Sequence, residues 1–73
     1  MTFDSVGAKL AERPFRPIRV IMSSGDSYDV LSRGTVLLTR SDLVVGVNLE
    51  DEGIPKNFRI CSLDQIAAIE QSE

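Results

Sequence analysis

The sequence has no histidine, no tryptophan and only one cysteine among its 73 residues. Without histidine, the chain cannot build Ser/His/Asp or Cys/His nucleophile pairs, and it lacks the commonest metal ligand. A single cysteine forms no internal disulfide, and one cysteine without histidine excludes ordinary zinc sites. No glycine-rich phosphate-binding motif occurs either. We therefore expect a protein that is not an enzyme and that has no cofactor.

Long hydrophobic runs are also missing. Unbroken apolar stretches such as 20–22 and 36–38 are far too short to span a bilayer. The first ten residues contain no basic segment followed by a long apolar stretch, so no signal peptide is expected. These features predict a cytoplasmic protein with no membrane partner.

The composition is that of one small globular domain covering residues 1–73. Apolar residues make up 42% of the chain, which suits a packed core rather than a disordered segment. The net charge is −3 and the isoelectric point is about 4.8. Basic residues dominate the first part of the chain and acidic residues the rest. This asymmetry suits either contact between copies or two simply solvated ends.

The N-terminal pattern predicts a helix over residues 3–12. Thr2 is a suitable N-cap, because its hydroxyl can accept a backbone N–H of the first turn. The apolar residues at helical spacing are Phe3, Val6 and Leu10. Pro14 disfavours helical geometry in the residue before it, so the helix ends ahead of it. Such a short helix needs a surface to lie on.

Residues 15–70 predict five or six short strands, with a frayed tail over 71–73. Gly25 marks a tight turn between two alternating segments, and Gly46 suggests a bend or bulge in mid-strand. An acidic loop is expected over 50–57, and a single turn at 63–65 before a last strand. The expected fold is mainly β, with a strongly bent antiparallel sheet closing into a small barrel. From Pro17 onward, hydrophobic side chains are expected to line one inner wall, with the helix capping an open end or covering a face.

These residues resemble a family of small uncharacterised bacterial proteins that is abundant in planctomycetes. The resemblance covers nearly all of the chain: the "RPFRP" block of residues 13–17, a glycine hairpin, "YDV", "LVVGV", and "FRICSLDQIAAIE". It implies no known activity. The family often has Asp-Gly at the first hairpin, where this chain has Ser24-Gly25. It also often has His-Pro-Glu where this chain has Ser32-Arg33-Gly34, so no role of that histidine can operate here.

The order of a helix, a bent sheet and a terminal strand–turn–strand also looks like the Sm-like barrel of RNA-binding ring proteins, one of the small SH3-like β-barrels. The likeness implies a fold only, since the RNA-contact motifs of Sm-like proteins are not visible in this sequence. RNA binding does not follow from it.

The best candidate contact residues for a nucleic acid or a partner are five arginines. They are Arg13, Arg16, Arg19, Arg33 and Arg40. On an extended segment, Arg13 and Arg19 can share a side while Arg16 faces away, which weakens the case for a single patch. The low isoelectric point also argues against nucleic-acid binding. The alternative is that the arginines lie over apolar surface or pair with nearby acids.

The remaining reactive side chains favour structural roles. Cys61 is expected to be a small core side chain, because Arg59 is the only nearby cation that could activate a thiol. The acidic segment 50–52 lacks the carboxylate spacing of a calcium loop and is interpreted as a solvated loop. No spacing forces together two of the three carboxylates that could form an acid/base pair: Asp26, Asp29 and Asp64.

The sequence therefore predicts a protein-interaction module that associates with itself, or with another protein, through an exposed sheet edge. Weak RNA binding through the arginines is the alternative.

Overall fold

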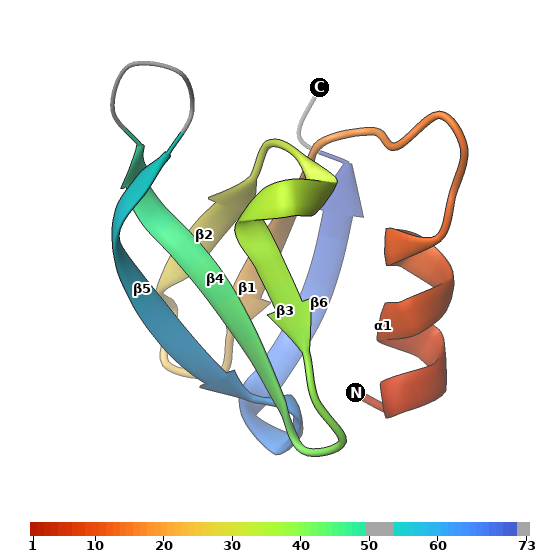
Figure 1. Cartoon of the computed structure of the whole chain (residues 1–73). Helices are drawn as coiled ribbons and strands as arrows, with labels where there is room; N and C mark the ends of the chain where they lie inside the picture. The colour runs from red at the N-terminus through yellow and green to blue at the C-terminus, as the bar shows by residue number, and fades with distance from the viewer. Residues whose placement is uncertain (50–53, 72–73) are drawn as a thin grey trace.

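The computed structural model describes residues 1–49 and 54–71 (Figure 1). One helix is followed by six strands: α1 (Phe3–Leu10), β1 (Ile18–Met22), β2 (Ser27–Val30), β3 (Val36–Leu38), β4 (Asp42–Leu49), β5 (Pro55–Ser62) and β6 (Ile66–Gln71). Short 3-10 turns, Arg33–Thr35 and Leu63–Gln65, precede β3 and β6. The predicted acidic segment 50–52 and tail residues 72–73 lie outside the described residues, whereas the first tail residue, Gln71, ends β6.

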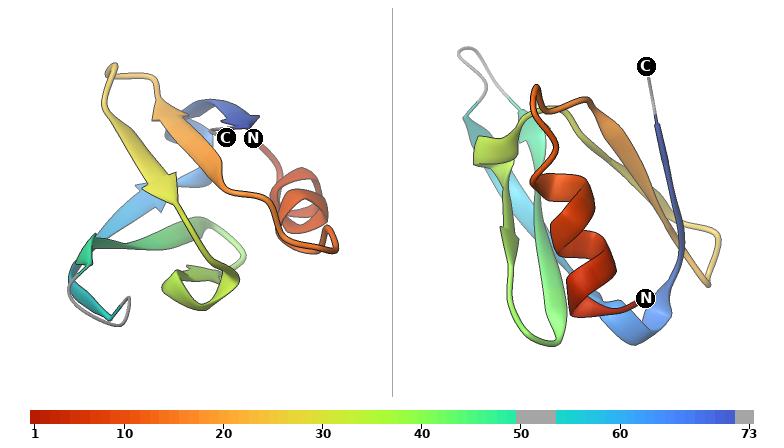
Figure 2. Two further views of the ribbon diagram at one scale, coloured as in Figure 1. Left: turned by 90° about the horizontal axis from the view of Figure 1, so that it is seen from above. Right: turned by 90° about the vertical axis from the view of Figure 1, so that its right-hand side faces the viewer.

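The strands form two three-stranded antiparallel sheets, in the orders β2-β1-β6 and β3-β4-β5 (Figures 1 and 2). The mainly β prediction is confirmed, but the predicted single sheet closing into a barrel is wrong for the part of the chain that the structure describes. The chain leaves the extended conformation at Arg33–Thr35, so no hydrogen-bonded ladder runs from β2 into β3. The turn Leu63–Gln65 separates β5 from β6 in the same way.

The helix begins with the predicted cap. The Thr2 hydroxyl accepts the backbone N–H of Ser5 at 3.1 Å, and the Ser5 side chain completes a capping box. The helix ends at Leu10, two residues earlier than predicted, because Ala11 already acts as the C-cap. Val6 and Leu10 are buried, as predicted. Phe3, in the first turn, is 43% exposed, so the prediction that it shares their buried face is wrong. The helix packs along one side of the two sheets (Figure 2).

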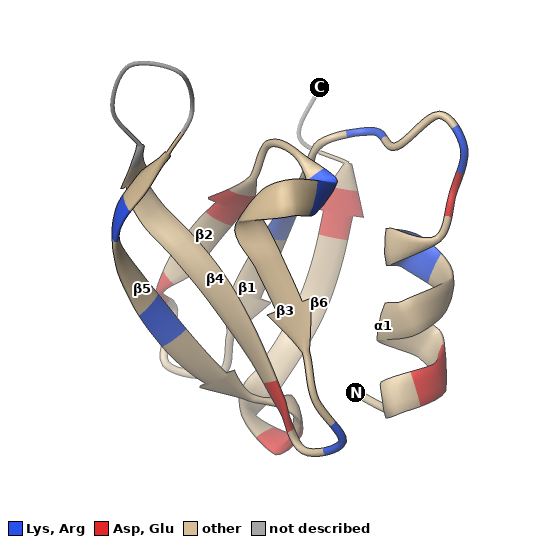
Figure 3. Cartoon of the chain, viewed as in Figure 1, with Lys and Arg blue, Asp and Glu red and all other residues tan. Residues whose placement is uncertain are grey.

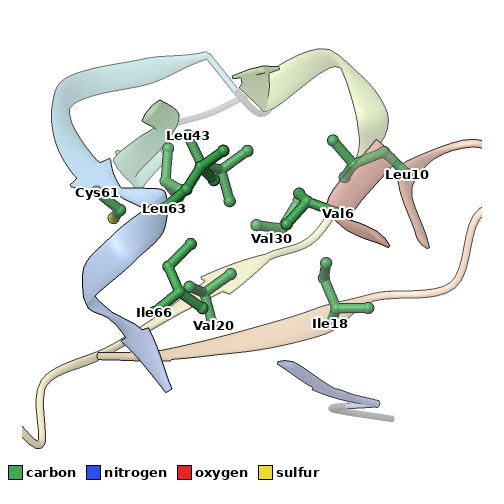
Figure 4. Packing of buried hydrophobic residues seen from close by; sticks show 10 residues of the cluster. Val6, Leu10, Ile18, Val20, Val30, Leu43, Cys61, Leu63 and Ile66 are labelled. Carbon is green, nitrogen blue, oxygen red and sulfur yellow. The ribbon is translucent and has the colours of Figure 1, made fainter. Parts of the chain in front are cut away.

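The core lies between the sheets and the helix (Figure 4). Its ten residues are aliphatic apart from one cysteine: Val6, Leu10, Ile18, Val20, Val30, Leu43, Val45, Cys61, Leu63 and Ile66. In β1 and β4 these residues alternate with outward ones, as the period of two predicts. The helix and every strand except the short β3 contribute a buried side chain, so the core depends on the two sheets and α1 together.

The turns and irregularities of the strands differ in part from the prediction. Gly25 has φ +99° in the turn between β1 and β2, as expected of a glycine turn. Gly46, however, pairs in regular register with Phe58, so the predicted bulge is not there. A register shift occurs instead between β1 and β6, at Ile21/Met22. The loop predicted over 50–57 is too long, because β5 begins at Pro55.

None of the helices in the described part of the chain has the length and apolar character needed to cross a membrane.

Candidate interaction surface

One face of the sheet β3-β4-β5 packs on the core and the other, here called the outer face, points away from it. Leu43 and Val45 of β4 are fully buried, so the residues between and beyond them, Val44 and Gly46, belong to the outer face. In an antiparallel ladder, residues that are directly opposite share a face. The register of β3 and β5 against β4 therefore identifies the remaining residues of the outer face.

Four apolar side chains meet on the outer face, and we call them the outer patch: Leu37, Val44, Phe58 and Ile60. Leu37 of β3 and Ile60 of β5 lie directly opposite Val44, one on each side. Leu37 is 62% exposed, Phe58 62% and Ile60 64%. An exposed apolar patch of this kind often marks an interaction site.

The outer patch corrects the prediction of a single inner apolar wall. The sequence correctly places Phe58 and Ile60 on one face of a strand, but that face is exposed. Only Cys61 of β5 is buried, because β5 is an edge strand and only its end reaches the core. The signal was present in the sequence: Cys61 and Leu63 have the opposite parity to Phe58 and Ile60, so the segment carries two apolar faces rather than one.

A hollow of about 320 Å³ adjoins the outer patch, lined in part by Thr35, Gly46, Pro55 and Phe58. Gly46 lines this hollow but is itself buried, because the Pro55 ring lies directly against it. A Cβ at Gly46 would come within 2.6 Å of the Pro55 Cγ and 3.1 Å of the Thr35 carbonyl oxygen. The close approach of the Pro55 ring explains why glycine stands in mid-strand.

Polar residues lie at the two ends of the outer face. Asp42 at the start of β4 is opposite Ser62, which is two residues after Ile60. Lys56 lies two residues before Phe58 on β5 and belongs to the same face by alternation. The outer face is thus apolar in the middle, with a carboxylate at one end and an ammonium group at the other.

The five predicted arginines do not gather on one element (Figure 3). Arg13 and Arg33 line a common hollow beside Pro14, and Arg13 and Arg16 line a neighbouring one. The Arg16 side chain donates to the Gln71 side chain at 2.9 Å.

The other two arginines lie apart from these. Arg19 is paired with Asp29, its direct partner across β1 and β2, at 3.0 Å. Arg40 lies in the turn after β3, whereas Arg33 lies in the turn before it. Nucleic-acid binding by the arginines stays a prediction.

The candidate reactive groups have structural surroundings. Cys61 is buried, and burial, together with the negative charge of Asp42, raises the pKa of its thiol. Asp26 lies in the β1–β2 turn, Asp29 is paired with an arginine, and Asp64 lies in the turn before β6. Among the described residues, no group of three or more Cys, Asp or Glu side chains could hold a metal ion.

No family model matches the chain, and searches of curated proteins and of solved structures found no match to it.

Proposed function

We propose that this chain is a non-enzymatic protein-interaction module that associates with itself through the outer patch. The observation that carries the proposal is the row of Leu37, Val44 and Ile60 across three adjacent strands, with Phe58 beside it. Three of these four side chains are more than half exposed. Covering them with another apolar surface removes them from water, which is the main favourable term in protein association.

The expected sheet edge is part of this surface. In the sheet β3-β4-β5, the strand β5 is at the edge and supplies two of the four outer-patch residues, Phe58 and Ile60. Pro55, Lys56 and Arg59 lie on the same strand, and such residues are typical of edges that are protected from open-ended pairing. We therefore favour contact through the face of the sheet, with β5 at its margin, over simple strand addition.

Size supports association as well. A domain of 73 residues has a small core, and natural proteins of this size often gain stability from oligomers. The free, buried Cys61 is compatible with the expected cytoplasmic location.

The direct test is the molar mass of the protein over a wide concentration range, by sedimentation velocity and by light scattering. A reversible shift from monomer to dimer mass with rising concentration is the expected result. A constant monomer mass up to the highest soluble concentration contradicts the proposal. A shift that is unchanged when Phe58 is replaced by serine shows that association uses another surface.

A further inference from the structure

We infer that a hollow between the end of α1 and the turn before β3 binds a small molecule that carries one carboxylate or phosphate group on an apolar body. We call it the arginine hollow, and its volume is about 350 Å³. Its lining includes Leu10, Glu12, Arg13, Pro14, Phe15 and Arg33. None of these residues belongs to the outer patch, so the site is independent of the proposed function.

The two arginines of the arginine hollow come from different segments, and both are available to a ligand. Arg13 follows α1, whereas Arg33 begins the 3-10 turn that precedes β3. Both are exposed, and in the part of the chain that the structure describes neither side chain forms a hydrogen bond or an ion pair. A guanidinium group presents several N–H donors in one plane and can bind two oxygens of a carboxylate or phosphate at once. Two such groups in one hollow therefore favour an oxyanion there.

The charges around the arginine hollow are mainly positive, although the whole chain has a net charge of −3. Glu12 is the only acid in its lining among the described residues, and the Lys9 Nζ lies 3.8 Å from the Glu12 carboxylate. Arg16 lines the adjoining hollow together with Arg13. Basic positions accordingly gather around the C-terminal end of α1 (Figure 3). The negative end of a helix dipole is equivalent to only about half an elementary charge, so it does not cancel this excess.

The local character of this positive charge favours a small ligand over a nucleic acid. At physiological salt, exposed charges are largely screened beyond about 8 Å. The chain measures 32 × 27 × 22 Å, so much of its acidic surface lies farther from the arginine hollow than that (Figure 3). A small anion therefore interacts mainly with the nearby basic groups. An RNA strand also meets the acidic surface, and an isoelectric point of about 4.8 is untypical of proteins that bind it.

The apolar part of the lining favours a ligand with an apolar body. Leu10 is buried, Phe15 is partly buried against the core, and Pro14 lies beside it in the chain. The volume of about 350 Å³ is within the range of small-molecule sites, about 300–1,000 Å³. A bare carboxylate or phosphate group fills only a small part of it, because a water molecule takes up only about 30 Å³. A flat hydrocarbon group can cover the remaining lining while the arginines bind its anionic end.

Titrations followed by backbone amide NMR shifts test the inference, with phenyl phosphate and phenylacetate as the probes. We expect the amide shifts to change at the lining residues and not on the outer patch. The relative affinities of the two probes identify the preferred anion. Inorganic phosphate and benzyl alcohol each carry only one part of the ligand, and we expect each to bind about tenfold more weakly than the better probe.

Arginine variants give the decisive comparison. Arg13→Gln and Arg33→Gln each remove one guanidinium group, and we expect each to weaken binding of the better probe about tenfold. Arg40→Gln is the matched control, because it changes the net charge equally and Arg40 is also exposed but does not line the hollow. We expect it to leave binding unchanged. Glu12→Gln removes the nearest negative charge and tightens binding about threefold.

Thermal unfolding of each variant is recorded first, and Arg13→Lys or Arg33→Lys replaces a glutamine variant that does not fold. A smaller loss of affinity is then expected, because lysine keeps the charge but lacks the planar group. The inference is overturned if neither probe shifts the lining amides up to its solubility limit, or if the wild type and both arginine variants bind equally. An equal loss in Arg40→Gln also overturns it, because that result indicates a general effect of net charge.

Discussion

The substitution Ile60→Thr isolates the contribution of one outer-patch side chain to association. Threonine is also β-branched and suits a strand, so β5 keeps its local preference. Ile60 is 64% exposed in the monomer, and the monomer therefore loses little when the side chain is shortened. The dimer loses an apolar contact in each of its two copies.

The size of the effect follows from the exposed fraction. Full burial of an isoleucine side chain contributes about 1.5–3 kcal/mol. With 64% of Ile60 still to be covered, its burial in the dimer contributes about 1–2 kcal/mol per copy, or roughly 2–4 kcal/mol per dimer. A factor of ten in the dissociation constant corresponds to about 1.4 kcal/mol, so we expect a dimer that is weaker by roughly thirty- to several-hundred-fold.

Sedimentation velocity over a concentration series measures this change, and urea unfolding of dilute protein reports on the monomer. Arg59→Thr is the matched control, because it introduces the same residue one position away on the opposite face. Equal dissociation constants for Ile60→Thr and wild type would refute the reasoning. So would an equal loss of affinity in Arg59→Thr, because that result would indicate a general effect of changing β5.

Three further predictions concern the fold. Gly46→Ala destabilises the protein by about 1–3 kcal/mol, because the new methyl group collides with the Pro55 ring. A lower midpoint of thermal unfolding is the expected result. An unchanged midpoint would contradict the prediction, because it would mean that the ring can move aside. Thr2→Ala removes the helix cap and lowers the free energy of unfolding by about 1 kcal/mol, measured in urea, whereas Thr2→Ser retains the cap and serves as the control. The raised pKa of Cys61 means that its thiol stays protonated in the folded chain when the unfolded chain ionises near its ordinary value of 9.0. The contribution of the protonated thiol to the free energy of unfolding is therefore fully present below that pH and is lost as the pH rises toward the folded pKa. Urea unfolding at a series of pH values measures this decline, and we expect Cys61→Ala to reduce it. Equal declines in the variant and the wild type would contradict the prediction.

Local patterns in the sequence were sufficient for the helix and the first hairpin. Thr2 and Pro14 bracket α1 to within two residues, because capping and the restriction before proline act on the nearest neighbours. The alternating segments on either side of Gly25 predict β1 and β2. Once that hairpin is in register, the contact between Arg19 and Asp29 follows, because the two residues lie directly opposite each other.

Local patterns could not predict the features that depend on contacts between segments distant in the sequence. Whether the strands close into a barrel depends on β2 continuing into β3, and the turn Arg33–Thr35 that prevents it has no strong local signature apart from Gly34. Alternation also says that Phe58 and Ile60 share a face, but not whether another element covers that face. The outer patch becomes visible only when Leu37 and Val44 from other strands are placed beside them.

The pairing of β1 with β6 has a consequence for how the chain is made. Ile18 is opposite Gln71, so the sheet β2-β1-β6 joins segments from nearly the two limits of the sequence. The sheet β3-β4-β5, in contrast, joins only strands that follow one another. During synthesis on the ribosome, the second sheet can assemble from local hairpins, whereas the first stays incomplete until its last strand has emerged from the exit tunnel. Until β6 has emerged, one edge of β1 stays unpaired, and unpaired strand edges are where folding intermediates tend to aggregate.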